Sequence, residues 1–299
     1  MLAALPTNRY PMIQLNDERM RAANAAAVAS RDGVSLVAFY GDAKPEALRK
    51  LLATVSAHFA ARLREFVGLF DPYPLSQVHA TIAGLEGKKA APASGDIVVG
   101  DNAQARQHRF GGATSPIDFS GLLAFLRQYP WPVPFQFGGY SPTDRNPFDV
   151  RNSPWDRTFD VQQNGLVVIM AWSCLRNGTP FAPTLLSIRK SLEKYGVVHK
   201  YHIDPAEQDN DLFLVLGSLR WAVWRDLKDA GSDNRALAAL REARDDVRLG
   251  PLARPLLVQM DSEQLSVVRY ECTTLGRVKF RQSLDRIEPS AMAQQYDRI

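Results

Sequence analysis

The sequence predicts an α+β protein in which two similar lobes, each with a mainly antiparallel sheet and flanking helices, surround a central cleft. In several segments apolar residues recur at spacings of three and four, as in amphipathic helices, and in others they form the short runs typical of strands. Both halves of the chain repeat one order of elements: helix, strand ending in glycine, helix and paired strands. The chain has 299 residues, 45% of them hydrophobic, and can therefore bury a large core.

The N-terminal part is expected to contain a helix, a strand and a second helix. Residues 1–30 form an N-terminal helical extension in this prediction, since 16–30 is rich in alanine and charge. The apolar run 34–40 predicts a strand. Pro45 then opens a long amphipathic helix, in which His58 is expected to be a structural residue on a helix face. The apolar positions of this helix are Leu48, Leu51, Leu52, Val55, Phe59, Leu63 and Phe66.

The middle of the chain alternates between extended and helical patterns. A strand at 78–84 is followed by a loop from about 87 to 115 that is rich in glycine, alanine and lysine. Asp118 or Ser115 is expected to cap the next helix. That helix covers 119–129, and two extended runs follow it at 133–137 and 158–172.

The last third predicts further helices and strands. Gly196 is expected to end a helix, because glycine tolerates the left-handed conformation at a helix C-terminus. The final strands are expected to form a meander. Residues 31–287 are predicted to be one domain of two lobes, followed by a tail at 288–299. The elements in this part are a helix at 185–195, a strand at 212–217, a helix at 234–247 and strands at 256–260, 265–272 and 278–284.

The repeated order of elements predicts an internal duplication. The strand at 78–84 and its following helix correspond to the strand at 212–217 and the helix near Arg235. The strands around Phe135 and Val167 correspond in the same way to those around Val258 and Val267. We therefore expect the two lobes to face one another.

Composition limits the classes of function. The net charge of +4 and the pI near 9.1 permit an anionic ligand but lack the dense basic stripe of a duplex-binding protein, so we expect no duplex DNA partner. The sequence shows no secretory signal and no long apolar segment, which predicts a cytoplasmic protein without membrane contact. Cys174 and Cys272 have no metal-ligand spacing and indicate a reducing compartment.

The strand at 78–84 contains the sequence's most informative motif, Val78-His79-Ala80-Thr81-Ile82. Side chains alternate along a strand, so His79 and Thr81 share one face while their apolar neighbours share the other. An imidazole transfers protons near neutral pH, and a hydroxyl donates hydrogen bonds to phosphate oxygens. The pattern therefore makes His79 and Thr81 candidates for a catalytic pair.

With this motif and order of elements, the region from about 34 to 285 resembles the 2H phosphoesterase superfamily. That superfamily includes RNA 2′,3′-cyclic phosphodiesterases, 2′-5′ RNA ligase-like proteins and phage enzymes that degrade cyclic oligonucleotides. The resemblance implies a bilobal α/β fold with one His-x-Thr/Ser motif per lobe on facing strands. It also implies that His79 is an acid or base and that Thr81 donates to a phosphate oxygen.

The second motif of the superfamily is missing. At the corresponding place the sequence reads Asp211-Leu212-Phe213-Leu214-Val215-Leu216-Gly217, and neither Phe213 nor Val215 can transfer a proton or hold a phosphate. Loss of one proton-transfer group typically costs about 100- to 10,000-fold in rate. We therefore expect impaired or altered catalysis.

Other residues are weaker candidates for the site. His199 and His202 lie shortly before the strand that lacks the second motif, and they can turn toward the cleft. A metal site at these histidines needs further ligands, and we expect no metal site there. The expected ligand contacts are Tyr40 and, on the basic loop, Lys88, His108 and Arg109. Phe135, Phe137, Tyr140, Trp221 and Trp224 can stack on bases but favour core packing.

The hypotheses for function belong to three classes. The first is a 2H phosphoesterase-like protein, without cofactor, acting on a phosphodiester of a small nucleotide, cyclic oligonucleotide or RNA end. The second is a non-catalytic protein that binds a nucleotide or another anion in the same cleft. The third is a scaffold whose cleft is filled by its own side chains. The oligomeric state stays open, and the sequence has no P-loop, dinucleotide-binding glycine pattern or nucleophile elbow.

Overall fold

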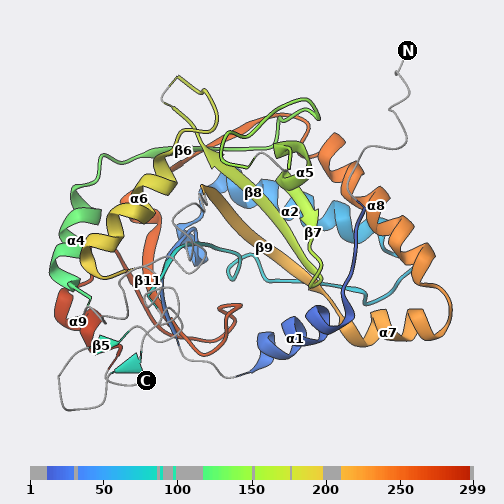
Figure 1. Ribbon diagram of the computed structural model, residues 1–299, viewed down its shortest axis with the longest axis horizontal. Coiled ribbons are helices and arrows are strands. Elements are labelled where there is room, and N and C mark those ends of the chain that lie inside the picture. Colours follow the sequence, from blue (N-terminus) through green and yellow to red (C-terminus); the bar gives the residue numbers. More distant parts are fainter. Residues whose placement is uncertain are drawn as a thin grey trace.

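The computed structural model describes residues 12–29, 33–85, 88–89, 97–98, 117–149, 152–175, 177–197 and 210–296. Strands from both halves of the chain form one ten-stranded sheet in which the paired strands are antiparallel, and helices pack around it (Figure 1). The mixture of helices and antiparallel strands agrees with the predicted fold class. The expected two sheets are instead one continuous sheet, because β3 and β9 are hydrogen-bonded to each other.

The sheet path runs β10-β6-β8-β9-β3-β1-β11-β12, with β2 paired to β9 and β7 paired to β8. The β3–β9 pair lies in the middle of this path, with three further strands on each side. The strand bounds are β1 Gly33–Ala38, β2 Phe70–Pro72, β3 Ala80–Gly84, β6 Val133–Phe137, β7 Phe159–Val161, β8 Leu166–Ser173, β9 Asp211–Leu219, β10 Leu256–Met260, β11 Leu265–Tyr270 and β12 Val278–Ser283. A separate two-stranded sheet joins β4 Lys88–Lys89 to β5 Ile97–Val98.

Helices lie at both ends of the sheet. Figure 1 shows α4, α6 and α9 together at one end and α1, α7 and α8 at the other, with α2 behind β8 and β9. The helix bounds are α1 Asp17–Val28, α2 Glu46–Arg62, α4 Phe119–Gln128, α5 Pro154–Thr158, α6 Thr184–Leu192, α7 Trp221–Asp229, α8 Asp233–Leu249 and α9 Pro289–Ala293. Three short 3-10 helices cover Gly41–Ala43, Glu193–Tyr195 and Ser262–Gln264.

The expected helix ends are confirmed. Pro45 is the N-cap of α2, and the Asp118 carboxylate accepts a hydrogen bond from the main chain of Gly121 at the start of α4. Gly196, with a φ of 77°, ends the 3-10 turn that follows α6. Local sequence thus determines these ends through the capping chemistry of single residues.

Two predictions about strands were wrong in detail, and one strand was missed. The run 158–172 is not one strand: its first residue ends α5, and β7 and β8 form a hairpin around Gly165, which has a φ of 80°. The short strand β2, which pairs with β9, was not predicted. The final strands do not form a meander, because β10 pairs with β6 while β11 pairs with β1 and β12.

The sheet is strongly curved. Six strand spacings separate β10 from β11 along the path, which is roughly 29 Å in a flat sheet. Four residues connect Met260 to Leu265, and such a connection spans at most roughly 18 Å. The two parts of the sheet therefore bend toward one another where β10 ends and β11 begins.

The main core lies on one face of the sheet. It contains Leu36, Ala80, Ile82, Leu212 and Leu214, all at most 1% exposed, packed with α2 and other helices. Smaller apolar clusters occupy the opposite face, which we call the second face. Their buried members are Val37, Tyr140, Trp155, Val168, Met170, Trp172, Val268, Tyr270 and Leu275.

Both ends of the described chain contribute to the core. Met20 of α1 is fully buried in the main core, and Asn24 binds the main chain of Leu219 and Trp221. Tyr296 is also fully buried, and its hydroxyl donates to the Leu85 carbonyl at 2.6 Å. The segments expected as an extension and a tail thus pack against the domain between them. Within the described part of the chain, no helix is both long and apolar enough to cross a membrane.

Candidate functional site

His79 and Thr81 lie on the second face, at the centre of the sheet. Ala80 and Ile82 point into the main core, so the alternation of the strand turns His79 and Thr81 to the opposite side. Both side chains are half-buried. Strand β3 begins at Ala80, two residues later than expected, and His79 is in the segment that leads into it. The structure therefore brings together the two residues of the predicted motif.

The orientation of the His79 ring is fixed by the main chain. Its Nδ1 lies 2.8 Å from the Gln77 carbonyl oxygen. A carbonyl oxygen only accepts hydrogen bonds, so Nδ1 carries the proton in this contact. In the neutral imidazole the lone pair is then on Nε2. This is the arrangement that a general base requires, with one nitrogen held by the protein and the other able to take a proton.

Two buried cations hold the main chain around this motif. Lys44, which is 3% exposed, donates through Nζ to the carbonyls of Phe39 and Val78, the latter at 2.6 Å. Arg189, on α6 and 2% exposed, donates to the carbonyls of Thr81 and Ile82 at 3.1 and 3.0 Å. Charged donors make strong hydrogen bonds in a buried setting, so these contacts keep the backbone of the motif in place.

Burial makes the charged form of the Lys44 side chain less favourable in free energy. Burial, followed by the nearby charges of Arg49 and Arg281, lowers the pKa of Lys44 to about 8. Phe39, one of its acceptors, has a φ of 62°, which is uncommon for a residue other than glycine. The contact with Lys44 thus helps to hold a strained turn immediately after β1.

Strand β9 provides the other half of the central pair. Ala80 lies opposite Leu214, and both are fully buried in the main core. Phe213 and Val215 therefore lie on the second face together with His79 and Thr81. They are half-buried and apolar. The structure pairs Ala80 with Leu214, so Phe213 and Val215 lie beside the segment that contains His79 and Thr81, and neither of them can transfer a proton.

A cluster of charged residues lies at the start of β9. Asp211, on the same face as Phe213, accepts a hydrogen bond from the Trp172 indole nitrogen at 2.5 Å and pairs with Arg157. Arg157 also pairs with Asp149 at 2.9 Å. The sequence analysis missed this cluster. An aspartate that opens an apolar strand was a local signal, but nothing in the sequence indicated its partners.

Tyr40, which was predicted to contact a ligand, lies beside His79. The two ring centroids are 6.1 Å apart, with an edge-on geometry of 76°. The Tyr40 hydroxyl donates to the Leu275 carbonyl at 3.1 Å, and the guanidinium carbon of Arg281 lies 5.4 Å from the tyrosine ring centroid. Burial raises the pKa of the Tyr40 hydroxyl, which stays protonated at neutral pH. Arg281 was not singled out from the sequence.

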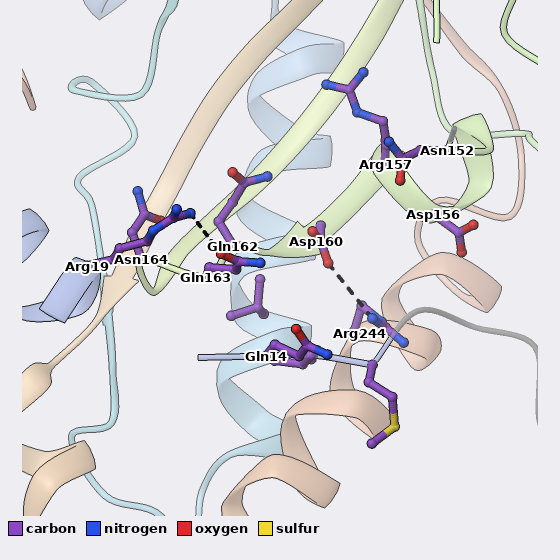
Figure 2. Close-up of a pocket in the computed structure, with 13 residues that line it drawn as sticks. Gln14, Arg19, Asn152, Asp156, Arg157, Asp160, Gln162, Gln163, Asn164 and Arg244 are labelled. Carbon is purple, nitrogen blue, oxygen red and sulfur yellow. Dashed lines mark hydrogen bonds and ion pairs between the residues drawn. The ribbon is translucent and has the colours of Figure 1, made fainter. Parts of the chain in front are cut away.

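A polar cavity of about 640 Å³ lies elsewhere, between β7, α8 and the segment before α1 (Figure 2). Its charged groups bind one another or other protein groups: Arg244 pairs with Asp160 at 3.9 Å, and Arg19 donates to Gln163 at 2.8 Å. Burial raises the pKa of Asp160. Arg244 and Asp160 thus compensate each other, and Arg19 is engaged by a neutral amide, so these groups already have partners within the protein.

Several predicted site residues lie outside the described parts of the chain: His108, Arg109, His199 and His202. Lys88 is described only through its main chain in β4. Among the described residues, no group of histidine, cysteine, aspartate or glutamate side chains could hold a metal ion. Phe135, Phe137, Tyr140 and Trp224 are buried, which confirms core packing for these four aromatic residues.

No family model matches the sequence, and no curated protein matches it at a significant level. The structure is similar to Usb1 of Kluyveromyces marxianus, with 12% identity, a TM-score of 0.39, and coverage of 86% of this chain and 99% of that chain. For the same protein with uridine monophosphate, the identity is 14%, the TM-score 0.38 and the coverage 86% and 99%.

A third similar structure is a conserved protein of unknown function from Agrobacterium tumefaciens. Its identity is 11% and its TM-score 0.33, with coverage of 86% of this chain and 87% of that chain. TM-scores at this level carry no conclusion about function. The function of this protein therefore has to be argued from its own site.

Proposed function

We propose that this protein is a 2H phosphoesterase-like protein that binds a phosphodiester of a small nucleotide, cyclic oligonucleotide or RNA end at His79 and Thr81, and cleaves it with one acid–base group. The observation that carries the proposal is the placement of His79: its Nδ1 is bound to the Gln77 carbonyl, and it shares a sheet face with Thr81. Such a pair supplies a base and a phosphate ligand side by side.

In the proposed reaction, a water molecule attacks phosphorus and loses a proton to Nε2 of His79. The Thr81 hydroxyl donates to a non-bridging oxygen, whose negative charge grows in the transition state. The bond from phosphorus to the ester oxygen breaks, and this oxygen takes its proton from solvent. Phe213 and Val215 cannot provide that proton, so cleavage is slower than with two acid–base groups.

The strand order supports a twofold relation between the two parts of the sheet. Counted outward from the central pair, β3, β1, β11 and β12 on one side match β9, β8, β6 and β10 on the other. This matching differs from the predicted duplication, which related the strand around Phe135 to that around Val258, because β6 and β10 are neighbours on one side of the sheet. We propose a twofold axis between Ala80 and Leu214, which would relate His79 to Phe213 and Thr81 to Val215. Phe213 and Val215 would then occupy the position of the second motif. His79 and Thr81 would be the half of a symmetrical site that still has a proton-transfer group and a phosphate ligand.

A non-catalytic binding protein is the second candidate. The apolar, half-buried pair Phe213 and Val215 favours it, since a phosphate can be held by His79 and Thr81 without a group that protonates the leaving oxygen. In this case the ligand is a nucleotide or RNA terminus that is bound and released intact.

The test compares His79→Gln with His58→Gln, a matched change at a histidine of α2 outside the site. Purified proteins are incubated with nucleoside 2′,3′-cyclic phosphates and 2′-5′-linked dinucleotides, and products are separated by chromatography. We expect His79→Gln to lower the rate by at least about 100-fold and His58→Gln to leave it near that of the wild type.

The results of this experiment distinguish the phosphodiesterase from the non-catalytic binding protein. Equal activity in both variants contradicts a catalytic His79. If the wild type forms no product, a ligand-dependent increase in melting temperature that His79→Gln abolishes supports the binding protein. Absence of both product and thermal shift contradicts the proposed site.

A further inference from the structure

Arg281 is an exposed cation whose guanidinium group lies over the ring of Tyr40. It lies on β12 opposite Val268, a buried residue of the second face, and therefore on the same face as His79 and Thr81. Its guanidinium carbon stands 5.4 Å from the Tyr40 ring centroid. Gly41 leaves room for this group, because a side chain at that position would come against Arg281 Nη1. Stacking on Tyr40 thus restricts the guanidinium to a defined place.

Two neighbouring cations of the β11–β12 hairpin share an acidic partner, unlike Arg281. Lys279 pairs with Glu271 at 2.7 Å, and Arg277 pairs with the same carboxylate group at 3.3 Å. Within the described part of the chain, Arg281 has no carboxylate partner within 4.0 Å. A stacked guanidinium without an acidic partner keeps its hydrogen-bond donors available for an external anion.

The position of Arg281 relative to His79 is limited by Tyr40. The guanidinium is 5.4 Å from the tyrosine ring, and that ring is 6.1 Å from the imidazole, so Arg281 lies at most about 11.5 Å from His79. The bond from the Tyr40 hydroxyl to the Leu275 carbonyl keeps the intervening ring in place. An anionic group at Arg281 is therefore close enough to a phosphate at His79 to belong to the same ligand.

The local electrostatics favour an anion at this place. Arg281 and Arg49 both contribute to the low pKa of Lys44, which shows that several positive charges lie around the turn after β1. Asp42 acts in the opposite sense on Lys44 but is a single exposed carboxylate. A ligand with negative charge both at His79 and at Arg281 would reduce the repulsion among these cations.

We infer that Arg281 binds a second phosphate of the ligand whose reacting phosphate lies at His79 and Thr81, so that the protein prefers nucleic-acid fragments with at least two phosphates over mononucleotides. This inference rests on the proposed function. Arg281 acts here as a ligand-binding residue, and Tyr40 positions its guanidinium. The preference arises from affinity at the second phosphate and is independent of whether the reacting phosphate is cleaved.

The test measures binding rather than turnover. Dissociation constants are determined by calorimetry for a nucleoside 3′-monophosphate, with one phosphate, and for a dinucleotide 3′-monophosphate, with two. The variants are Arg281→Ala and, as matched control, Arg286→Ala, which removes an arginine side chain that is 81% exposed shortly after β12. We expect the wild type and the control to bind the dinucleotide about 10-fold more tightly, and Arg281→Ala to lose this preference.

The results distinguish failure of the inference from failure of the proposed function. If Arg281→Ala weakens both ligands equally, or if the wild type shows no preference, the second phosphate site is wrong while binding at His79 stands. If neither ligand binds the wild type, the proposed function itself is wrong. A smaller loss of preference in Arg281→Lys than in Arg281→Ala supports the inference, since lysine keeps the charge but not the planar guanidinium.

Discussion

Replacement of Lys44 by methionine should change how the stability of the protein depends on pH. The Lys44 ammonium is buried and donates to the carbonyls of Phe39 and Val78, immediately before the candidate site. Methionine has a similar length and no charge, so Lys44→Met removes the titrating group while it fills most of the same space. The two carbonyls lose their donor, which lowers stability at every pH.

The pH-dependent part of the effect follows from the pKa of Lys44. It is about 8 in the folded protein against 10.5 for an ordinary lysine. Between these two values the unfolded chain binds a proton that the folded protein has released, so the free energy of unfolding of the wild type rises with pH in this window. The rise is roughly 1.4 kcal/mol per pH unit at most and about 3 kcal/mol in total.

Urea unfolding at several pH values from 7 to 11 tests this prediction. Tyrosine and cysteine residues titrate in the same range, but they are present in both proteins and cancel in the difference. We expect the free energy of unfolding of the wild type minus that of Lys44→Met to increase by about 3 kcal/mol from pH 7.5 to 10.5. A difference that stays constant over this range would refute the argument that burial holds the pKa of Lys44 down.

Three further sets of variants test the site. Thr81→Val should weaken binding of a nucleoside 3′-monophosphate by about 10-fold in calorimetry while Thr81→Ser retains it, because only valine lacks the hydroxyl; equal affinities would exclude Thr81 as a ligand. The double variant Phe213→His with Val215→Thr should raise the rate of cleavage by about 100-fold, and a folded variant with unchanged turnover would contradict the twofold relation. Arg189→Met should cost about 2 to 4 kcal/mol in urea unfolding, since it removes the donor to the carbonyls of Thr81 and Ile82; a loss below about 0.5 kcal/mol would show that these contacts are dispensable.

The sequence determined most helices and strands because their signals are local. The amphipathic period defined α2, and single capping residues defined the ends of α4 and of the turn after α6. The pairing of the strands was harder to predict from the sequence. Residues 256–260 and 265–270 follow each other closely, yet β10 and β11 lie far apart in the strand order. Register and neighbour choice depend on packing between distant segments, which alternation along one strand does not encode.

The grouping of the candidate site residues was predictable only in part. His79 and Thr81 are two residues apart, so their common face follows from strand alternation, and Tyr40 was expected near the ligand. Lys44 and Arg281 were not recognised. The contact between Arg281 and Tyr40 joins residues 241 positions apart, and an arginine that follows Arg277 and Lys279 at alternate positions has no sequence feature that distinguishes it from a solvent-exposed charge.

A crystal structure of the protein soaked with a nucleoside 3′-monophosphate tests the central claim most directly. We expect phosphate oxygens at about 3 Å from Nε2 of His79 and from the Thr81 hydroxyl, with Nδ1 still bound to the Gln77 carbonyl. A His79 ring packed against hydrocarbon, or a ligand bound only at another surface while the second face stays empty, would contradict it.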